Sequence, residues 1–350
     1  MSLTPKSVPT GAIRYNTDSN KMECFDGTKW WEISTSISNL GSNLGGSGRG
    51  VWGGGLTGPA DPSNYSRNGI DYITIATVGN STDFGDCTSI SFNQSAGAGS
   101  ATRGLFIGGY WPSAINSIDY ITFSSTGNAA DFGDTTVTFG KRGAFNNATR
   151  ACAFGGGTDA PNQAVINTID YVTIASTGNA LDFGDMSAVN SRQSGCSSPI
   201  RGFMMNGYNY STNTDAIKYV TTATTGNGQD FGDLTDVKKN MSSGASNSVR
   251  GFCIGGFYSP NAPTNSNKIH WFEMSSTGNG QEFGEMSAVG RMGGAVSDSV
   301  RIVMGRGIAD TNYNTLEYIT ITTRGNALDF GDLVNPIGGA ATTSNSNGGL

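Results

Sequence analysis

Short stretches of the chain alternate hydrophobic and polar residues, and Gly, Asn or Ser separates each stretch from the next. The stretch SIDYITF, residues 117–123, is typical, because Ile118, Tyr120 and Thr122 fall on one face of an extended segment. Closely related stretches, TIDYVTI and TLEYITI, recur further along the chain. This two-residue periodicity in short stretches predicts an all-β protein.

Three markers indicate that one unit is repeated six times. A carboxylate-Phe-Gly-carboxylate motif has its first acids at Asp83, Asp131, Asp182, Asp230, Glu282 and Asp329. An arginine recurs at Arg49, Arg103, Arg150, Arg201, Arg250 and Arg301, and an aromatic residue at Tyr72, Tyr120, Tyr171, Tyr219, Trp271 and Tyr318. Units of about 50 residues made of short strands are typical of β-propeller blades.

Each unit reads as four strands, so the sequence predicts a six-bladed β-propeller of four-stranded blades. The first strand of each blade is rich in small residues, as in SAGAGSAT, residues 95–102, because the innermost strands crowd around a central channel. The predicted domains are an N-terminal β-meander at 1–35, a flexible linker at 36–48 and the propeller at 49–350. The innermost strand of the first blade comes from the C-terminal stretch IGGAATTSNSNGGL or from SNLGSNLGGSG before Arg49, and we favour the C-terminal stretch.

A Thr-Gly-Asn sequence precedes most of the acidic motifs and is expected to form the turn between the third and fourth strands, since Gly and Asn tolerate positive φ. The Phe of the motif is expected to fill the space between adjacent blades. The flanking carboxylates are expected to accept hydrogen bonds from turns or to pair with the repeated arginines, one arginine with the first acid of each motif. An alternative is calcium held by the paired carboxylates.

Composition narrows the classes of function. Only 14% of the residues are charged and the formal net charge is −6, so binding of nucleic acid through its phosphates is not expected. No stretch resembles a membrane span or a secretory signal. The five cysteines lack metal-ligand spacing and are expected to be free thiols, with Cys152 and Cys253 in the core. We expect no metal and no cofactor.

Catalysis is not expected either. The only histidine, His270, takes the place of Asp71, Asp119 and Asp170 in the other repeats. Its side chain is predicted to point outward into solvent, with no nucleophile beside it. The sequence therefore predicts a protein that is not an enzyme.

Two resemblances follow from these motifs. The Gly-Gly pair, the aromatic about eleven residues later and the period near 50 make residues 45–350 similar to kelch-type β-propellers, although Phe stands where kelch repeats commonly have Trp. Residues 9–33, PTGAIRYNTDSNKMECFDGTKWWEI, resemble a short module of tailed-phage fibre and other virion proteins. The matching residues are Gly11, Arg14, Tyr15, Asn16, Thr17, Phe25, Asp26, Gly27 and Trp30. The repeat phrase itself is similar to repeats in cyanophage proteins.

The N-terminal segment reads as three strands of about 25 residues in all, too few to bury much apolar surface alone. Its apolar residues are therefore expected to dock on a partner surface: Ile13, Tyr15, Phe25, Trp30 and Trp31. The partner is expected to be another virion protein or further copies of the chain, for example in a trimer. Alternatively, the segment packs on the side of the propeller itself.

The loops between the second and third strands differ from blade to blade and emerge on the same face as the connections between blades. They carry aromatic residues that are expected to lie exposed on one side of the disc: Tyr65, Tyr110, Trp111, Tyr208, Tyr210, Tyr258 and Tyr313. Such residues, mixed with Asn, Ser and Thr, suit recognition of glycans or proteins. The alternative is that they only pack their own loops.

These observations favour a virion fibre or spike protein, located on a tail or other appendage and made in the host cytoplasm. Its expected role is non-catalytic recognition of a host-surface glycan or protein. A purely structural virion decoration and a glycan-acting enzyme remain alternatives.

Overall fold

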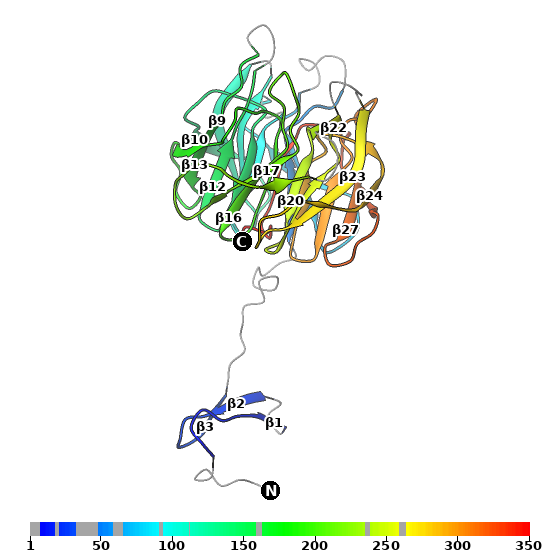
Figure 1. Cartoon of the computed structure of the whole chain (residues 1–350). Coiled ribbons are helices and arrows are strands. Elements are labelled where there is room, and N and C mark those ends of the chain that lie inside the picture. The colour runs from blue at the N-terminus through cyan, green and yellow to red at the C-terminus, as the bar shows by residue number, and fades with distance from the viewer. Residues whose placement is uncertain are drawn as a thin grey trace. The chain divides into compact units, whose positions relative to one another are not determined.

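The computed structural model describes residues 8–17, 21–32, 48–58, 66–90, 94–111, 113–158, 163–234, 239–258 and 264–350. The chain divides into two compact units, Met1–Asn43 and Leu44–Leu350 (Figure 1). The described part of both units contains strands and turns and no helix, which confirms the all-β prediction. The predicted linker at 36–48 lies outside the described residues, except for Gly48.

The first unit is a three-stranded antiparallel sheet in the order β1-β2-β3, formed by Ile13–Asn16, Lys21–Phe25 and Trp30–Glu32. The turn at Asp26 joins β2 to β3. The Asp26 carboxylate accepts hydrogen bonds from the Thr28 hydroxyl at 2.7 Å and from the backbone N–H groups of Lys29 and Thr28 at 2.8 and 2.7 Å. The Thr28 hydroxyl bond, followed by the backbone bonds, holds the pKa of Asp26 well below its ordinary value.

The second unit consists of six antiparallel sheets, numbered here in chain order. The first contains β4 (Arg49–Gly53), β5 (Gly69–Thr74), β6 (Thr82–Asp86) and the C-terminal β29 (Ala341–Ser344); the second contains β7 (Ala96–Gly99), β8 (Arg103–Tyr110), β9 (Ala114–Thr122) and β10 (Ala130–Asp134); the third contains β11 (Gly143–Asn146), β12 (Arg150–Phe154), β13 (Thr168–Thr173) and β14 (Leu181–Asp185).

The fourth contains β15 (Ser194–Ser197), β16 (Arg201–Met205), β17 (Ala216–Thr221) and β18 (Gln229–Asp233); the fifth contains β20 (Ser243–Ser246), β21 (Arg250–Ile254), β23 (Thr264–Glu273) and β24 (Gln281–Gly290), extended by β19 (Lys239–Asn240) and β22 (Phe257–Tyr258); the sixth contains β25 (Ala295–Ser297), β26 (Arg301–Gly305), β27 (Thr315–Thr320) and β28 (Leu328–Asp332). Repeated four-stranded antiparallel sheets of this kind are compatible with a β-propeller-like fold.

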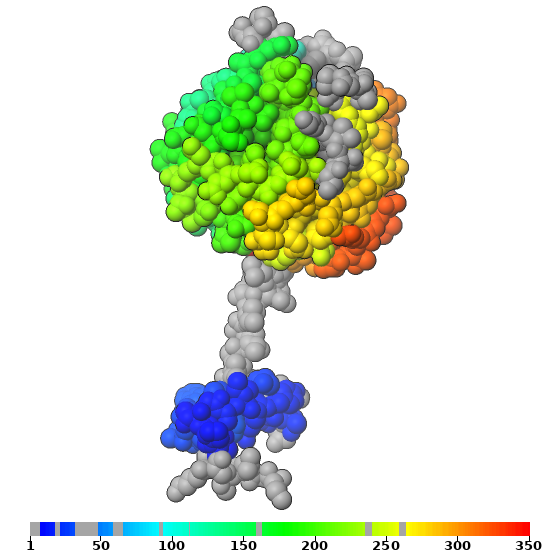
Figure 2. Space-filling model, viewed as in Figure 1, coloured from blue at the N-terminus to red at the C-terminus, as the bar shows by residue number. Residues whose placement is uncertain are grey.

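Sheets that follow one another in the sequence are neighbours in space, and Figure 2 shows the chain running from green through yellow to orange across one face of this unit. The first strand of each sheet contacts the first strand of the next, through β7, β11, β15, β20, β25 and β29, and β29 also contacts β7. These strands approach so closely that a Cβ on Gly195 or Gly244 would collide with the carbonyl oxygen of the neighbouring strand. This contact explains their small residues, as predicted.

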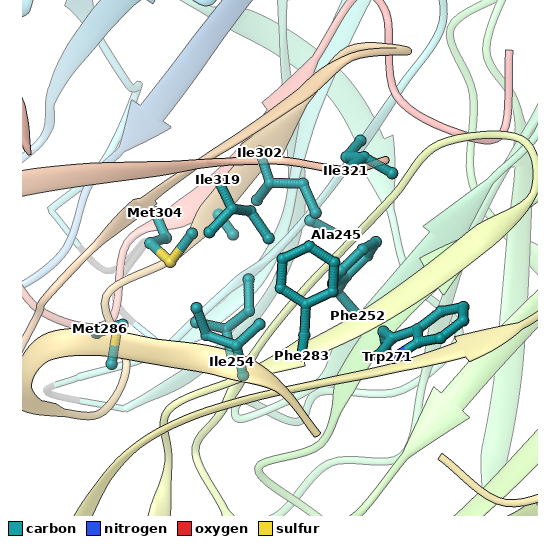
Figure 3. Close-up of a cluster of buried hydrophobic side chains, with 12 residues drawn as sticks. Ala245, Phe252, Ile254, Trp271, Phe283, Met286, Ile302, Met304, Ile319 and Ile321 are labelled. Atoms are coloured by element: carbon teal, nitrogen blue, oxygen red, sulfur yellow. The ribbon is translucent and has the colours of Figure 1, made fainter. Parts of the chain in front are cut away.

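The core lies between neighbouring sheets. Figure 3 shows Phe252 and Phe283 of the fifth sheet facing Ile302 and Ile319 of the sixth, all almost fully buried. The motif Phe thus fills the space between sheets, as predicted. Burying one such ring stabilises the fold by about 2 kcal/mol.

The C-terminal strand pairs with the first strand that follows the linker. β29 runs antiparallel to β4, with Ala341 opposite Gly53 and Ser344 opposite Gly50. The C-terminal stretch therefore supplies the innermost strand of the first sheet, the arrangement that the sequence favours. Residues 345–350 continue from β29 onto other sheets, where the Asn347 and Asn146 side-chain amides exchange hydrogen bonds of 3.2 and 3.0 Å.

Candidate functional site

The two ends of the strands in each sheet differ in their connections, and we call them the turn edge and the loop edge. At the turn edge, short turns join the first strand to the second and the third to the fourth. At the loop edge, longer loops join the second strand to the third, and the connections between sheets arrive. Backbone pairs such as Gly140 with Gly157 and Ser191 with Tyr208 join connections to loops, so the two share this edge, as predicted.

The Thr-Gly-Asn turn binds the acidic motif of the preceding sheet. Gly127 donates its N–H to the carbonyl oxygen of Phe84 at 2.7 Å, and the Asn128 side-chain oxygen accepts from the N–H of Asp86 at 3.1 Å. The same two bonds occur at the other five turns, Gly178-Asn179, Gly226-Asn227, Gly278-Asn279, Gly325-Asn326 and Gly79-Asn80. The Gly-Asn sequence therefore recurs because every turn has to fit the acidic motif of the neighbouring sheet.

Two glycines make this fit possible. The turn glycine has a φ between 151° and 158° in all six turns, as expected. The asparagine takes an ordinary φ and serves through its side chain, so its predicted positive φ is wrong. The motif glycine lies beneath the turn: a Cβ on Gly133 would stand 2.5 Å from the carbonyl oxygen of Gly178, which leaves no room for a side chain.

The repeated arginines do not pair with the motif acids, so that prediction is wrong. Arg103 donates to the carbonyl oxygen of Ile174 in the next sheet at 2.9 Å, and its guanidinium lies 4.9 Å from the ring centroid of Tyr120. Its five equivalents also bind carbonyl oxygens of the following sheet, at Phe123, Thr222, Met274, Ile321 and Ala76.

The position of the acids explains the error. The third strand lies between the strand that bears the arginine and the strand that bears the acid, as where Arg150 faces Thr173 while Asp182 faces Asp170. The first acids of all six motifs are exposed. Two of them pair with lysines of the third strand, Lys218 with Asp230 at 2.6 Å and Lys268 with Glu282 at 2.8 Å.

Acids of the third strand are buried and have structural partners. Asp119 accepts hydrogen bonds from the backbone N–H and the hydroxyl of Thr88, at 2.7 and 2.8 Å, and Glu317 binds Ser287 in the same way. Asp170 pairs with Arg142 at 2.6 Å, and both side chains are at most 1% exposed. Burial lowers the pKa of Arg142, and the nearby Asp170 opposes this shift.

His270 occupies the same row and is 1% exposed, so the predicted solvated histidine is wrong. Each face of the third strand is covered by a neighbouring sheet. A side chain is therefore buried whichever face of this strand it lies on. The described residues contain no group of three or more His, Cys, Asp or Glu side chains that could hold a metal ion.

The cysteines are free thiols, and Cys152 and Cys253 are fully buried, as predicted. Burial raises the pKa of the Cys152 and Cys196 thiols well above its ordinary value. Thiols in this state are poor nucleophiles.

The loop edge contains a feature that sequence reasoning missed, a cycle of backbone hydrogen bonds that we call the lip. It consists of Gln94, Lys141, Arg192, Met241, Met292 and Gly339, each two or three residues before a first strand. Each lip residue donates its N–H to the carbonyl oxygen of the lip residue before it, at 2.8–2.9 Å, and Gln94 donates to Gly339 at 2.6 Å. All six have a φ between 48° and 73°, five of them without being glycine.

The lip surrounds the mouth of a cavity of about 130 Å³ between the first strands. Three cationic residues line the cavity, namely Lys141, Arg142 and Arg192, together with Gln94, Met241, Met292 and several serines and glycines. None of the described lining residues is a carboxylate, although the whole chain has a net charge of −6. The described lining therefore contains basic side chains and no acidic ones.

Aromatic rings hold the lip cations. The Lys141 ammonium lies 4.4 Å from the ring centroid of Tyr110, and the Arg192 guanidinium lies 5.9 and 6.0 Å from those of Tyr208 and Tyr210. Tyr208 and Tyr210 also contact each other edge to face, at 5.4 Å. These contacts help to fix the cations at the loop edge.

The loop aromatics do gather at the loop edge, but the expectation that they are freely exposed is wrong. Six of them are half-buried: Tyr110, Trp111, Tyr208, Tyr210, Tyr258 and Tyr313. Their rings pack on each other or on cations, as where the Arg306 guanidinium lies 3.6 Å from Tyr313, and the Tyr210 hydroxyl donates to the carbonyl oxygen of Thr158. Tyr65 lies outside the described residues.

A third guanidinium lies close to Arg192. Burial lowers the pKa of Arg291, and the positive charge of Arg192 lowers it further. Arg291 donates to the Asn265 side-chain oxygen at 2.7 Å and lies 4.8 Å from the ring centroid of Phe257. Arg291 is therefore a further basic residue at the loop edge, outside the cavity lining.

The first unit has one apolar face. Cross-strand pairing puts Ile13, Cys24 and Trp31 in one row and Tyr15 beside Met22. Ile13, Tyr15 and Trp31 are 54–60% exposed within the described residues, as a docking surface requires. The other two predicted docking residues, Phe25 and Trp30, do not lie on this face. Phe25 is 1% exposed, and its ring centroid lies 5.2 Å from that of the half-buried Trp30. Phe25 is therefore a core residue of the unit.

Comparisons with known proteins add no family: the chain matches no family model and no curated protein sequence. Within the described residues, no helix has the length and apolar character needed to cross a membrane.

Proposed function

We propose that the six sheets are the blades of one closed six-bladed β-propeller, with β29 completing the first blade. The arrangement is supported by contacts that continue from the sixth sheet to the first. Gly79 donates to the carbonyl oxygen of Phe330 at 2.8 Å, and Arg301 binds the carbonyl oxygen of Ala76. The hydrogen-bond cycle of the lip and the contact between β29 and β7 support the same arrangement.

The function that we propose is non-catalytic recognition of a host-surface glycan or protein by a virion fibre or spike protein. One observation carries this proposal: the turn edge repeats the same bonds in every sheet, whereas the loop edge has a different set of cations and aromatic rings in each. Repeated contacts serve the frame, and binding residues are commonly found on loops that a rigid scaffold positions.

The role of the first unit is attachment to the virion, either to another virion protein or to further copies of this chain. Its exposed apolar face, with Ile13, Tyr15 and Trp31, supports this role, because a small sheet gains stability when a partner covers such a face. The resemblance of residues 9–33 to a phage fibre module also supports it.

Catalysis has less support. The buried acids Asp119 and Asp170 accept hydrogen bonds from the framework, and His270 is enclosed between sheets. None of these side chains is thereby presented to a substrate.

Adsorption of the full chain to host cells tests the proposal. We expect Trp111→Ala and Tyr210→Ala to weaken adsorption about tenfold, since removing an aromatic anchor commonly costs more than 1 kcal/mol of binding. Leu181→Ala, an exposed position on β14 of the turn edge, is the matched control and should leave adsorption unchanged.

A purely structural decoration protein gives a different result. It shows no adsorption to cells, and Trp31→Ser removes it from the virion. Adsorption that persists in both loop variants while their unfolding curves stay unchanged would show that the loop aromatics are not the binding residues.

A further inference from the structure

The fifth sheet departs from the repeat at the turn edge. The residue opposite the repeated arginine is threonine in the other five sheets, as where Thr122 faces Arg103, whereas Glu273 faces Arg250 in the fifth. The aromatic residue two positions earlier is tyrosine in the same five sheets and Trp271 in the fifth. Residues that serve only the frame are expected to repeat, so these two exchanges indicate an additional role.

A cavity of about 200 Å³ lies at these two residues. The rest of its lining consists of Phe272 and residues of the following turn, namely Ser276, Thr277, Gly278, Asn279 and Gln281. Trp271 and Phe272 are buried, whereas the turn residues are exposed, so the cavity has aromatic rings on its inner side and a polar rim. At roughly 10–15 Å³ for each water, it has room for about fifteen waters or one small ring-shaped molecule.

Trp271 has a hydrogen-bond donor without an acceptor. The residue is 7% exposed, and its indole N–H is buried with no hydrogen-bond partner among the described residues. The Arg250 and Arg324 guanidinium groups lie 4.4 and 4.9 Å from a Trp271 ring centroid, but a guanidinium has no acceptor. Because an unpaired buried donor costs free energy, a ligand oxygen that accepts from this N–H would be stabilised.

The remaining groups of the lining both donate and accept hydrogen bonds. Glu273 is the carboxylate of the lining and pairs with Arg250 at 3.2 Å, so its charge is compensated within the protein. The Gln281 side-chain oxygen accepts from Arg324 at 2.6 Å, which leaves the amide nitrogen of Gln281 as a donor. Hydroxyls and amides at the rim match an uncharged ligand whose own groups also donate and accept.

We propose that this cavity binds one neutral sugar unit, with one hydroxyl group of the sugar accepting from the Trp271 N–H and others bound to Glu273 and Gln281. The aromatic rings cover the C–H surface of the sugar, while the polar rim binds its hydroxyl groups. The site lies at the turn edge, whereas the loop aromatics lie at the loop edge. The inference therefore goes beyond the proposed function and does not rest on it.

Calorimetric titration of the full chain with four neutral sugars tests the inference: glucose, galactose, mannose and N-acetylglucosamine. We expect at least one of them to bind. Raising the salt concentration should change its affinity by less than about twofold, because binding neutralises no charge. The inference is overturned if none of the four sugars binds, or if salt weakens the binding about tenfold.

Two variants locate the site, and each restores the residue that the other five sheets have at that position. Trp271→Tyr and Glu273→Thr should each weaken binding of the preferred sugar about tenfold, as loss of hydrogen bonds to the ligand implies. Their unfolding curves should stay close to that of the unsubstituted chain, since the same residues are accommodated elsewhere in the repeat. Unchanged binding in either folded variant overturns the inference.

A pair of equivalent glutamines supplies the matched control. Gln281 begins the acidic motif of the fifth sheet and lines the cavity, whereas Gln229 begins that of the fourth and lies outside the lining. Gln281→Ala should weaken binding about fivefold, and Gln229→Ala should leave it unchanged. Equal effects of the two substitutions would show that the sugar is not bound at the fifth sheet.

Discussion

At the turn edge each sheet repeats the bonds of the one before, whereas at the loop edge most of the described side chains differ from sheet to sheet. The turn edge has the same glycine, asparagine and arginine contacts between every pair of neighbouring sheets. At the loop edge only the backbone cycle of the lip is repeated, and its six side chains vary from lysine to glycine. In this protein, contacts that repeat between sheets indicate a structural role, and the positions that differ are the ones we propose for binding.

The largest loss of stability is expected from substitution of a motif glycine at the turn edge. Gly133→Ala puts a Cβ 2.5 Å from the carbonyl oxygen of Gly178, and this steric conflict adds to the strain of a φ of 146°. We expect a loss of about 4 kcal/mol in the free energy of unfolding, measured by denaturant titration.

The matched control is Gly127→Ala. Gly127 has a similar φ of 153°, but a Cβ there meets no atom within 4 Å, so only the backbone strain of about 1–2 kcal/mol remains. Equal losses in the two variants would mean that contact between turn and motif has no part in stability.

A smaller effect distinguishes the observed arginine contacts from the expected ion pairs. Arg150→Met removes hydrogen bonds of 3.1 and 3.0 Å to the carbonyl oxygens of Thr222 and Ala223, and a cation 4.8 Å from the Tyr171 ring centroid. We expect a loss of about 2 kcal/mol in thermal or denaturant unfolding. Asp182→Asn, which alters only an exposed acid, should change stability by less than about 0.5 kcal/mol. A comparable loss in Asp182→Asn would restore the ion-pair hypothesis.

The smallest effect concerns the turn asparagine. Asn179→Ala leaves the N–H of Asp134 without its acceptor at 3.1 Å, in a partly exposed position, and we expect a loss of about 1 kcal/mol. Asn179→Asp keeps an acceptor oxygen and should recover most of the stability. Hydrogen exchange of the Asp134 amide is the direct measurement, and an unchanged exchange rate in Asn179→Ala would show that this bond does not form in solution.

Much of the fold could be predicted because its causes are local or periodic. Alternation gave the strands, the small residues of 95–102 gave the innermost strand, and the Gly of Thr-Gly-Asn gave a turn with positive φ. The errors come from neighbours that are distant in sequence. His270 is buried, and Arg103 binds Ile174 rather than an acid, because the adjoining sheet supplies the surroundings of every third strand.

Less of the candidate site could be predicted. The aromatic loops were located at one edge, but the cations that pack on them, such as Lys141 and Arg192, belong to connections that look irregular in the sequence. The sequence did contain a usable signal, because five of the six lip residues precede the repeated arginine by the same nine positions, as Gln94 precedes Arg103. Their shared left-handed backbone could not be read from residue types, since lysine, arginine and methionine have no special preference for it.

The lip also affects how the protein can vary. Each lip residue already uses its backbone N–H and carbonyl oxygen in the cycle, so the frame does not depend on which side chain the residue has. Unbranched side chains can be exchanged there at small cost, whereas β-branched ones are disfavoured by the positive φ. Six interchangeable positions around one opening allow single substitutions to alter its charge while folding is preserved.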